Sequence, residues 1–418
     1  MKCTKAKKKF RSQEWFDNPN NPGMTALYIE RYQNQEFTRE ELQSDRPIIG
    51  IAQTGSDLTP CNKIHVFLMD RIKAGIRDAG GIPMAFPVHP IQETGKRPTA
   101  ALDRNLAYLS LVEILYGYPI DGVVLTTGCD KTTPAMLMGA ATVDLPSIVL
   151  SGGPMLDGWW KGKLAGSGMI VWEGRRLLAE GKIDYEEFIS RVCASAPSLG
   201  HCNTMGTAST MNAMAEALGM SLPGCSAIPA PFRERMAMAY STGKRIVEMV
   251  QENIKPSDIL TREAFENAIT IVIALGGSTN AVLHLLAMAH SIDVDLCLDD
   301  FTKIGKRTPV LADLKPFGKH YMSELNARGG IQPLMKTLLE KGLLHGDCIT
   351  VTGNSLEDNL KNIESYKDDE IIKTFENPIK NDSHLRILYG NLAKDGAVAK
   401  ITGKEGTSFE GKAKVFNS

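Results

Sequence analysis

The chain has 418 residues and a formal net charge of −1, with 43% hydrophobic and 23% charged residues. A chain of this length exceeds what one hydrophobic core usually supports, so we expect two domains. The near-zero net charge argues against broad binding to nucleic acid or to anionic membranes, because both need an excess of basic residues. Apolar runs stay below the roughly 20 residues that span a bilayer. Eight cysteines at irregular spacings do not resemble a disulfide framework, which favours a cytoplasmic protein with reduced thiols.

From residue 46 onward, apolar strand-like runs alternate with helical patterns. Strands are expected at 48–52, 82–88, 121–127 and 147–150, with helices at 64–79, 99–117 and 134–142. Alternation at this rhythm indicates βαβ units and a doubly wound, mostly parallel sheet. We therefore predict an α/β domain over residues 46–380. A polar N-terminal extension, residues 1–45, precedes it and begins with a basic stretch that we expect to be frayed.

The second half of the chain changes character twice. Helical patterns cover 171–181, 184–196, 205–218, 231–253, 262–275, 281–290 and 331–341, and a strand is expected at 348–351. Short strand-like runs then follow at 385–388, 397–401 and 413–416, split by Gly and Asp. This pattern indicates the start of a β-barrel-like second domain at 381–418. Three short strands are marginal as an independent domain, so we expect the chain to be cut off within it.

The most informative segment is the end of the third predicted strand. The apolar run Val123–Leu125 leads into Thr126-Thr127-Gly128 and then directly into Cys129, Asp130 and Lys131. In open α/β sheets, ligands bind outside the carboxyl ends of the strands. A soft thiolate, a hard carboxylate and an amine side by side therefore suggest a site for two kinds of metal chemistry. A surface turn with an ion pair is the plain alternative.

Cysteines elsewhere in the chain could complete such a site. Those in polar or Gly/Pro-rich turn contexts are Cys61, Cys129, Cys202 and Cys225. Three thiolates can hold an iron–sulfur cluster and leave one iron position open to a substrate oxygen. Their spacings match no compact metal-binding motif, so any three of the four remain candidates. The cysteines within helix or strand patterns, expected to be small buried hydrophobes, are Cys193, Cys297 and Cys348.

Carboxylates after strand ends are the candidates for a hard metal ion. Glu93 and Asp130 both follow predicted strands, which would place them at the same edge of the sheet. Carboxylates together with substrate oxygens are the usual shell of Mg²⁺. A cation would repel the neighbouring Lys131 unless this lysine were neutralised or chemically modified. The plain alternative for Lys131 is a salt bridge to Asp130 or another carboxylate.

A Gly-rich stretch before the helix at 281–290 is a candidate binding loop. Its residues Ser278, Thr279 and Asn280 lie at the expected helix N-terminus, which favours a carboxylate or phosphate ligand. Simple capping by these side chains explains the same residues and is the better explanation from the residues alone. The sequence contains neither a G-x-G-x-x-G motif nor a P-loop, so dinucleotide and NTP binding lose their usual support.

Together, these segments resemble the dihydroxy-acid dehydratase / phosphogluconate dehydratase family. The stretches that carry the resemblance are Thr59–Asn62, Cys129–Ala140, Gly200–Met205, Leu275–Ala281 and Leu388–Val398. Within that family, residues 86–93 and 200–203 are similar to the sugar-acid branch, the arabinonate and xylonate dehydratases. The resemblance implies a hydro-lyase that removes water from a 2,3-dihydroxy acid such as arabinonate or xylonate, giving a 2-keto-3-deoxy acid. It also implies a homo-oligomer, a dimer or a tetramer, in the full-length form.

The resemblance further implies the cofactors and their ligands. It selects Cys61, Cys129 and Cys202 for an iron–sulfur cluster, with [2Fe-2S] favoured over [4Fe-4S], and leaves Cys225 structural. It implies Glu93, Asp130 and a carbamylated Lys131 as ligands of Mg²⁺. The modification would resolve the repulsion noted above, because a carbamate is an anionic oxygen ligand. Ser278, Thr279 and Asn280 are the substrate-binding candidates.

The sequence departs from the family pattern at the catalytic base. The expected base is a serine in a Gly-Arg-Phe-Ser-Gly-like segment, and no such segment occurs up to Ser418. We therefore expect the base to lie beyond Ser418 and this chain alone to be inactive or nearly so. Three alternatives remain: a dihydroxy-acid dehydratase of branched-chain amino-acid biosynthesis, a non-catalytic iron–sulfur-binding fragment, and a plain α/β scaffold.

Overall fold

The computed structural model describes residues 10–35, 37–93, 99–366, 370–401, 408 and 410–415. At its centre lies a sheet made of β1 (Ile48–Gln53), β2 (Ile82–Pro87), β3 (Gly122–Thr127) and β4 (Ser147–Ser151). The strands are hydrogen-bonded in the order β2-β1-β3-β4, and every pair is parallel. The predicted α/β class with a parallel sheet is confirmed.

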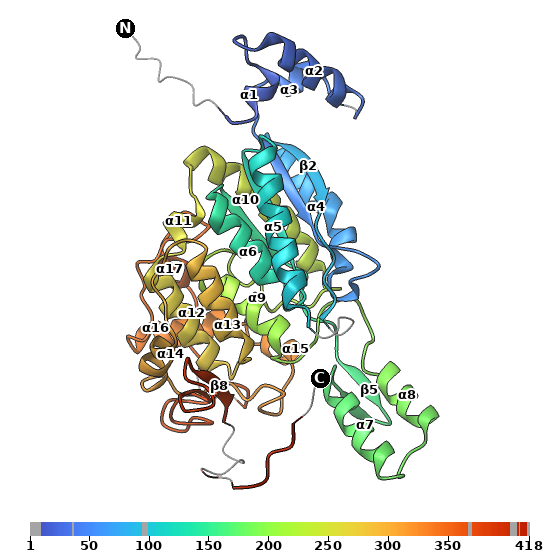
Figure 1. Ribbon diagram of the computed structural model, residues 1–418, viewed down its shortest axis with the longest axis vertical. Coiled ribbons are helices and arrows are strands. Elements are labelled where there is room, and N and C mark those ends of the chain that lie inside the picture. The colour runs from blue at the N-terminus through green and yellow to red at the C-terminus, as the bar shows by residue number, and fades with distance from the viewer. Residues whose placement is uncertain are drawn as a thin grey trace.

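Helices that connect the strands cover both faces of this sheet (Figure 1). The chain runs from β1 to β2 through α4 (Ile64–Asp78), from β2 to β3 through α5 (Ala101–Gly117), and from β3 to β4 through α6 (Thr132–Val143). The first connection crosses the sheet in the opposite direction from the next two. Right-handed crossovers therefore place α4 on one face and α5 with α6 on the other. The doubly wound arrangement follows from this reversal.

A second helix, α10 (Arg233–Glu252), packs against α4 so closely that only glycine fits at the crossing. A Cβ atom at Gly75 of α4 would lie 2.1 Å from the carbonyl oxygen of Tyr240, and one at Gly243 of α10 would lie 2.3 Å from that of Ile72. Either atom would overlap the facing backbone. Since α4 begins directly after the Cys61 turn, this crossing also fixes where that turn lies.

Strand β2 forms one edge of the sheet, and its sequence suits that place. The N–H groups of Ile82 and Val88, at even positions of this segment, donate to carbonyl groups of the β1 segment. The N–H groups at odd positions would point outward, but Pro83 and Pro87 have none. Proline is tolerated in strands mainly at such edges. The outer side of β2 therefore has few backbone N–H groups that could donate hydrogen bonds to another strand.

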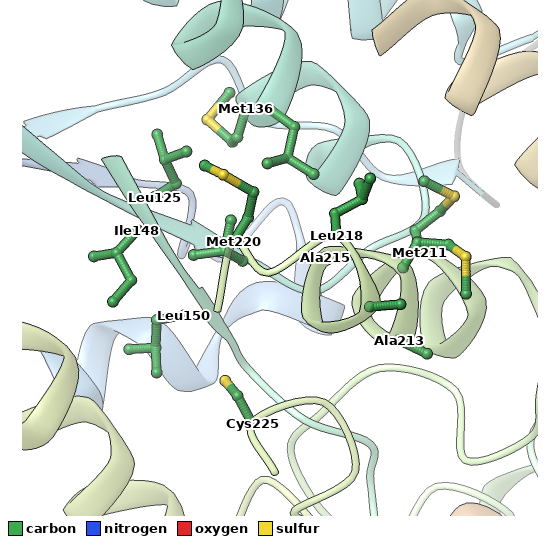
Figure 2. Close-up of a cluster of buried hydrophobic side chains, with 14 of the residues drawn as sticks. Leu125, Met136, Ile148, Leu150, Met211, Ala213, Ala215, Leu218, Met220 and Cys225 are labelled. Carbon is green, nitrogen blue, oxygen red and sulfur yellow. The ribbon is translucent and has the colours of Figure 1, made fainter. Parts of the chain in front are cut away.

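The core lies where β3 and β4 meet the helices. Leu125, Ile148 and Leu150 are fully buried, and Figure 2 shows them in one apolar cluster with Met136 and Met220. Both strands are buried on both faces, which explains why their sequences read as continuous apolar runs. This rigid centre supports the loops that leave the carboxyl ends of the strands.

The remaining elements surround this sheet. The N-terminal helices are α1 (Gln13–Phe16), α2 (Pro22–Gln33) and α3 (Arg39–Leu42), and Pro60–Asn62 is a short 3₁₀ turn. The hairpin β5 (Gly158–Trp160) and β6 (Lys163–Ala165) is followed by α7 (Met169–Ala179) and α8 (Tyr185–Cys193). The further helices are α9 (Thr207–Ala217), α11 (Pro256–Ile259), α12 (Arg262–Ala274), α13 (Asn280–His290), α14 (Leu298–Gly305), α15 (Met322–Asn326), α16 (Gln332–Glu340) and α17 (Leu356–Leu360). The chain ends in the antiparallel pair β7 (Leu385–Leu388) and β8 (Ala397–Lys400).

Some expected elements differ from the structure. The prediction of a strand at 348–351 is wrong: residue Ile349 forms only an isolated bridge with Ser355, and the Thr350 hydroxyl donates to the carbonyl of Asn354, which closes a turn. Residues 413–415 belong to no strand, and residue 416 lies outside the described residues. Among the described residues of the C-terminal region, β7 and β8 form a small antiparallel pair, and the start of a β-barrel-like domain at 381–418 stays a prediction.

The N-terminal segment and two cysteines also differ from expectation. The predicted polar extension contains the three helices α1–α3, whereas most of its basic stretch, residues 1–9, lies outside the described residues. Cys193 and Cys297 are exposed, so the prediction that they are buried is wrong. Both lie at helix ends rather than on a core-facing position. Within the ranges that the structure describes, no helix combines the length and apolar character needed to cross a membrane.

Candidate metal centre at the carboxyl edge of the sheet

The turn between β3 and α6 is held from two sides by asparagine side chains. The Asn62 side-chain oxygen accepts a hydrogen bond from the Cys129 N–H at 2.7 Å, and the Asn212 side-chain nitrogen donates to the Gly128 carbonyl at 3.0 Å. A Cβ atom at Gly128 would lie 2.6 Å from the Asn62 oxygen, so only glycine allows this approach. The backbone that presents Cys129 and Asp130 is therefore fixed before any ligand binds.

The structure brings together the three cysteines that the family resemblance selects. A hydrogen bond with the Cys61 thiol, burial and the nearby charge of Asp130 together raise the pKa of Cys129 well above its usual value. Burial raises the pKa of Cys202, the nearby charge of Cys129 raises it further, and the hydroxyl of Ser167, 3.3 Å from the Cys202 sulfur, lowers it. Three crowded thiols, of which that of Cys129 is buried and those of Cys61 and Cys202 are half-buried, cannot all ionise without a compensating cation. This donor set suits a positively charged iron–sulfur centre.

The fourth turn cysteine belongs to the core instead. Cys225 is fully buried, and Figure 2 shows it below Leu150 at the margin of the apolar cluster. Its sulfur accepts a hydrogen bond from the Arg235 guanidinium at 3.5 Å, while burial raises the pKa of its thiol. A buried thiol with a cationic partner already in place is consistent with the structural role expected for it.

Glu93, Asp130 and Lys131 meet beside the cysteines, at the edge of the sheet where they were expected. The Lys131 nitrogen lies 3.3 Å from an oxygen of Glu93 and 3.9 Å from an oxygen of Asp130. Burial and the charge of Glu93 raise the pKa of Asp130 to about 6, although Lys131 opposes this shift. The salt bridge weighed as an alternative for Lys131 is present, but it joins the same residues that would form the magnesium site.

No three histidine, cysteine, aspartate or glutamate side chains of the described residues form a compact site for a single metal ion. The chemistry of the candidate ligands explains why they do not form such a site. Two of the three magnesium candidates are carboxylates, and the third, Lys131, cannot bind a metal ion as an ammonium group. Cluster cysteines are divided among several iron atoms, so three of them do not converge on one point. The magnesium set therefore needs a third anionic oxygen at Lys131.

A buried histidine next to this set has an unsatisfied N–H group. The Nδ1 atom of His284 lies 3.3 Å from the Arg104 guanidinium, which can only donate, so Nδ1 accepts and Nε2 carries the hydrogen. That Nε2 atom is buried and has no hydrogen-bond partner among the residues that the structure describes. Burial, followed by the charges of Lys131 and Arg104, lowers the pKa of His284 to about 3, so the ring is neutral. A carbamate on Lys131 would offer oxygen acceptors in this neighbourhood.

The loop before α13 is held mainly by its own hydrogen bonds. Ser278 donates its N–H to the Thr210 hydroxyl at 3.1 Å, and the Ser278 hydroxyl accepts from the N–H of Asn280 at 3.2 Å. The Asn280 side chain donates to the Thr207 hydroxyl at 2.9 Å. These contacts favour the capping explanation for Ser278 and tie the loop to the start of α9. Substrate binding by Ser278, Thr279 and Asn280 stays a prediction.

Two basic side chains from the C-terminal region hold the preceding glycines, and sequence reasoning missed both. Lys400 donates to the carbonyls of Gly276 and Gly277 at 2.9 and 3.0 Å, and the Nε2 atom of His384 donates to the Gly277 carbonyl at 2.8 Å. Burial lowers the pKa of Lys400 to about 8. Gly276 has a φ of +66°, a left-handed conformation that favours glycine. The β7–β8 pair thus supports the candidate substrate loop.

A cavity of about 620 Å³ lies elsewhere, between the N-terminal helices and β2. Its lining includes Trp15, Tyr32 and Phe86 but none of the predicted ligands. The candidate metal ligands are therefore identified by the chemistry of their donor atoms and not by a position in this cavity.

Comparison with known proteins gives consistent matches along the chain. The sequence model of the family described as "Dihydroxy-acid/6-phosphogluconate dehydratase N-terminal" matches residues 46–359, and the C-terminal model of the same family matches residues 370–418. The chain is 55% identical to the D-xylonate dehydratase of Caulobacter vibrioides over 98% of this chain and 71% of that protein. It is 45% identical to the L-arabinonate dehydratase of Rhizobium leguminosarum (94% and 67% covered) and 48% identical to the dihydroxy-acid dehydratase of Chromohalobacter salexigens (91% and 67%). The chain spans 67–71% of the length of these three relatives, and the expected truncation stays a prediction.

The buried histidine beside the candidate loop should make stability depend on pH. Burial, with the charges of Lys400 and Lys380, lowers the pKa of His384 to about 3, below its usual 6.5. The unfolded chain therefore binds an extra proton between these values, and stability that is fully present above pH 6.5 is lost as the pH falls. We expect His384→Gln, which keeps an amide donor, to remove roughly 3 kcal/mol of the stability difference between pH 7 and pH 4.

Urea unfolding of both proteins across this pH range measures that difference. The exposed His290→Gln is the matched control and should leave the pH dependence unchanged. Parallel pH profiles for His384→Gln and the parent chain would contradict the assignment.

Proposed function

Because the chain belongs to the dihydroxy-acid/6-phosphogluconate dehydratase family, we propose that it is a hydro-lyase that acts on an aldonic acid. The reaction removes water from a 2,3-dihydroxy acid such as xylonate or arabinonate and yields a 2-keto-3-deoxy acid. The names of the D-xylonate and L-arabinonate dehydratases among its relatives support this substrate class. The observation that carries the proposal is the meeting of three thiols with a Glu–Asp–Lys set at one edge of the sheet.

The proposed cofactors follow from the donor sets. Cys61, Cys129 and Cys202 would hold an iron–sulfur cluster, with [2Fe-2S] favoured, and Glu93, Asp130 and a carbamylated Lys131 would hold Mg²⁺. The crowded thiols support the first assignment, and the unsatisfied N–H of His284 near Lys131 supports the second. When bound, the cluster supplies a Lewis acid for the departing C3 hydroxyl, and Mg²⁺ supplies positive charge for the anion that develops at C2.

The protein's own contribution is to hold the cluster ligands and the magnesium ligands in fixed positions. Asn62 and Asn212 fix the turn, so that Cys129 and Asp130 stay in neighbouring positions without reorganisation during the reaction. The loop at 278–280 would bind polar groups of the substrate, supported from behind by Lys400 and His384. The C2 proton still needs a base, and the serine segment that typically supplies it does not occur in these 418 residues. We therefore expect slow turnover from this chain by itself.

A second candidate function has one specific observation in its favour. The dihydroxy-acid dehydratase of Chromohalobacter salexigens is 48% identical to this chain, close to the values for the sugar-acid enzymes. A dihydroxy-acid dehydratase would act on 2,3-dihydroxyisovalerate in branched-chain amino-acid biosynthesis. A non-catalytic iron–sulfur fragment is the alternative from a different class of protein.

The cluster ligands can be tested through metal content. We expect the chain reconstituted without oxygen to bind iron and sulfide and to show visible absorption. Cys61→Ser, Cys129→Ser and Cys202→Ser should each lose most of this absorption, because a serine hydroxyl is a poor ligand for iron in a cluster. The exposed Cys193→Ser is the matched control and should keep full iron content. Full cluster occupancy in the Cys129 or Cys202 variant would refute the assignment.

The lysine modification can be tested without any activity measurement. With ¹³C-bicarbonate and Mg²⁺ present, we expect one carbamate carbon signal in the ¹³C NMR spectrum. Lys131→Gln should abolish the signal, and His284→Ala should weaken it because the carbamate loses a hydrogen-bond donor. Lys182→Gln, at an exposed lysine, serves as the control. A signal that persists in Lys131→Gln would rule out Lys131 as the modified residue.

The substrate class can be tested by binding and turnover on the reconstituted chain. We expect D-xylonate and L-arabinonate to bind at least roughly tenfold more tightly than 2,3-dihydroxyisovalerate, because a site that bonds sugar hydroxyls rejects an analogue that lacks them. Formation of 2-keto acid should be slow. A fast rate would mean that another residue of this chain acts as the base. The reverse binding order would favour the branched-chain enzyme, and no binding of any of the three acids would favour the non-catalytic fragment.

A further inference from the structure

The hydroxyl group of Ser167 donates a hydrogen bond to one of the candidate cluster ligands, the sulfur of Cys202, at 3.3 Å. In the part of the chain that the structure describes, neither Cys61 nor Cys129 accepts a hydrogen bond from a hydroxyl group. Ser167 lies just before α7, which belongs with β5 and α8 to a group of elements that extends away from the sheet (Figure 1). This contact therefore links that group to the candidate metal centre.

A chain of hydrogen bonds holds the backbone of Ser167. Its N–H group donates to the side-chain oxygen of Asn203 at 3.0 Å. Asn203 is fully buried, and its side-chain nitrogen donates to the Asp157 carboxylate at 2.7 Å, which fixes the orientation of the amide. Asp157 in turn accepts a hydrogen bond from the hydroxyl of Ser323. Because Asn203 directly follows Cys202 in the sequence, the same segment carries the sulfur and positions its donor.

The residue before Ser167 has to be glycine. A Cβ atom at Gly166 would overlap the ring of Tyr321. That ring is 1% exposed, and its hydroxyl accepts a hydrogen bond from Lys315 at 2.7 Å, so its neighbours hold it in place. A side chain at position 166 would therefore push Ser167 away from Cys202.

The backbone of Cys202 is held as well. Its carbonyl accepts hydrogen bonds from the Nδ1 atom of His201 at 3.0 Å and from the hydroxyl of Ser209 at 3.2 Å. The N–H group of His201 donates to the carbonyl of Gly153, in the loop that follows β4. The contact between Ser167 and Cys202 is therefore built into the fold and is not a chance position of a surface hydroxyl.

We propose that Ser167 is a positioning residue that tunes the iron–sulfur cluster through the sulfur of Cys202, an inference that rests on the cofactor proposed above. A thiolate has no hydrogen to donate, so the hydroxyl has to be the donor once Cys202 binds iron. Hydrogen bonds to the cysteine sulfurs are among the interactions that set the reduction potential of a cluster. The reduced cluster carries one more negative charge, so the donor stabilises it more than the oxidised cluster. Ser167 therefore raises the reduction potential.

Reduction potentials of chains reconstituted without oxygen test this role, with visible absorption and electron paramagnetic resonance as readouts. We expect Ser167→Ala to keep its iron, because all three cysteines remain. Its equilibrium constant for one-electron reduction should fall roughly tenfold, which lowers the midpoint potential by about 59 mV. Ser167→Thr keeps a hydroxyl and should retain the parent potential.

Two further variants make the test specific. Gly166→Ala keeps the hydroxyl but displaces it, so its potential should fall as in Ser167→Ala. Ser190→Ala, at a half-buried serine of α8, is the matched control and should leave the potential unchanged. Circular dichroism checks that every variant is folded.

The outcomes separate this inference from the proposed cofactor. A parent chain that binds neither iron nor sulfide would overturn both. A bound cluster with the same potential in the parent and in Ser167→Ala, or an equal shift in Ser190→Ala, would overturn only the role of Ser167. Loss of iron from Ser167→Ala that does not occur in Ser167→Thr would support the same hydrogen bond.

Discussion

The candidate site depends on the turn after β3, which hydrogen bonds from the Asn62 and Asn212 side chains hold in place. Asn62 reaches this turn from the segment that carries Cys61, and Asn212 reaches it from α9, which follows the Cys202 segment. Each asparagine thus links the turn of Cys129 to the neighbourhood of another cysteine. The relative positions of the three thiols are set by amide–backbone hydrogen bonds, which do not depend on the charge of the centre they surround.

The pKa values of the acidic groups explain why this cluster of thiols and carboxylates should bind cations. Asp130 and the thiols of Cys129 and Cys202 all have raised pKa values, because burial and mutual proximity penalise their charged forms. The thiols of Cys129 and Cys202 therefore stay protonated in the folded protein. Binding of a metal would release these protons, which makes metal affinity depend on pH.

Much of the fold was predictable because strand and helix periods are local properties of the sequence. The turn at Cys129 could be placed from the apolar run that precedes it, and the meeting of Glu93 with Asp130 from the rule that parallel strands share a carboxyl edge. Choosing Cys202 over Cys225 required the family resemblance, since both lie in turns. Lys400 and His384 could not be found, because they act across more than 100 residues through backbone carbonyls. The prediction of a strand at 348–351 was wrong because the side chain of Thr350 closes a turn there.

The two prolines of β2 have a consequence for the protein in a crowded solution. An open strand edge recruits other strands, and repeated recruitment leads to fibrous aggregates. Pro83 and Pro87 remove two of the outward donors that such growth would need. During synthesis, β1 and β2 leave the ribosome before β3 and β4, and the same residues then hinder pairing of the nascent sheet with neighbouring chains.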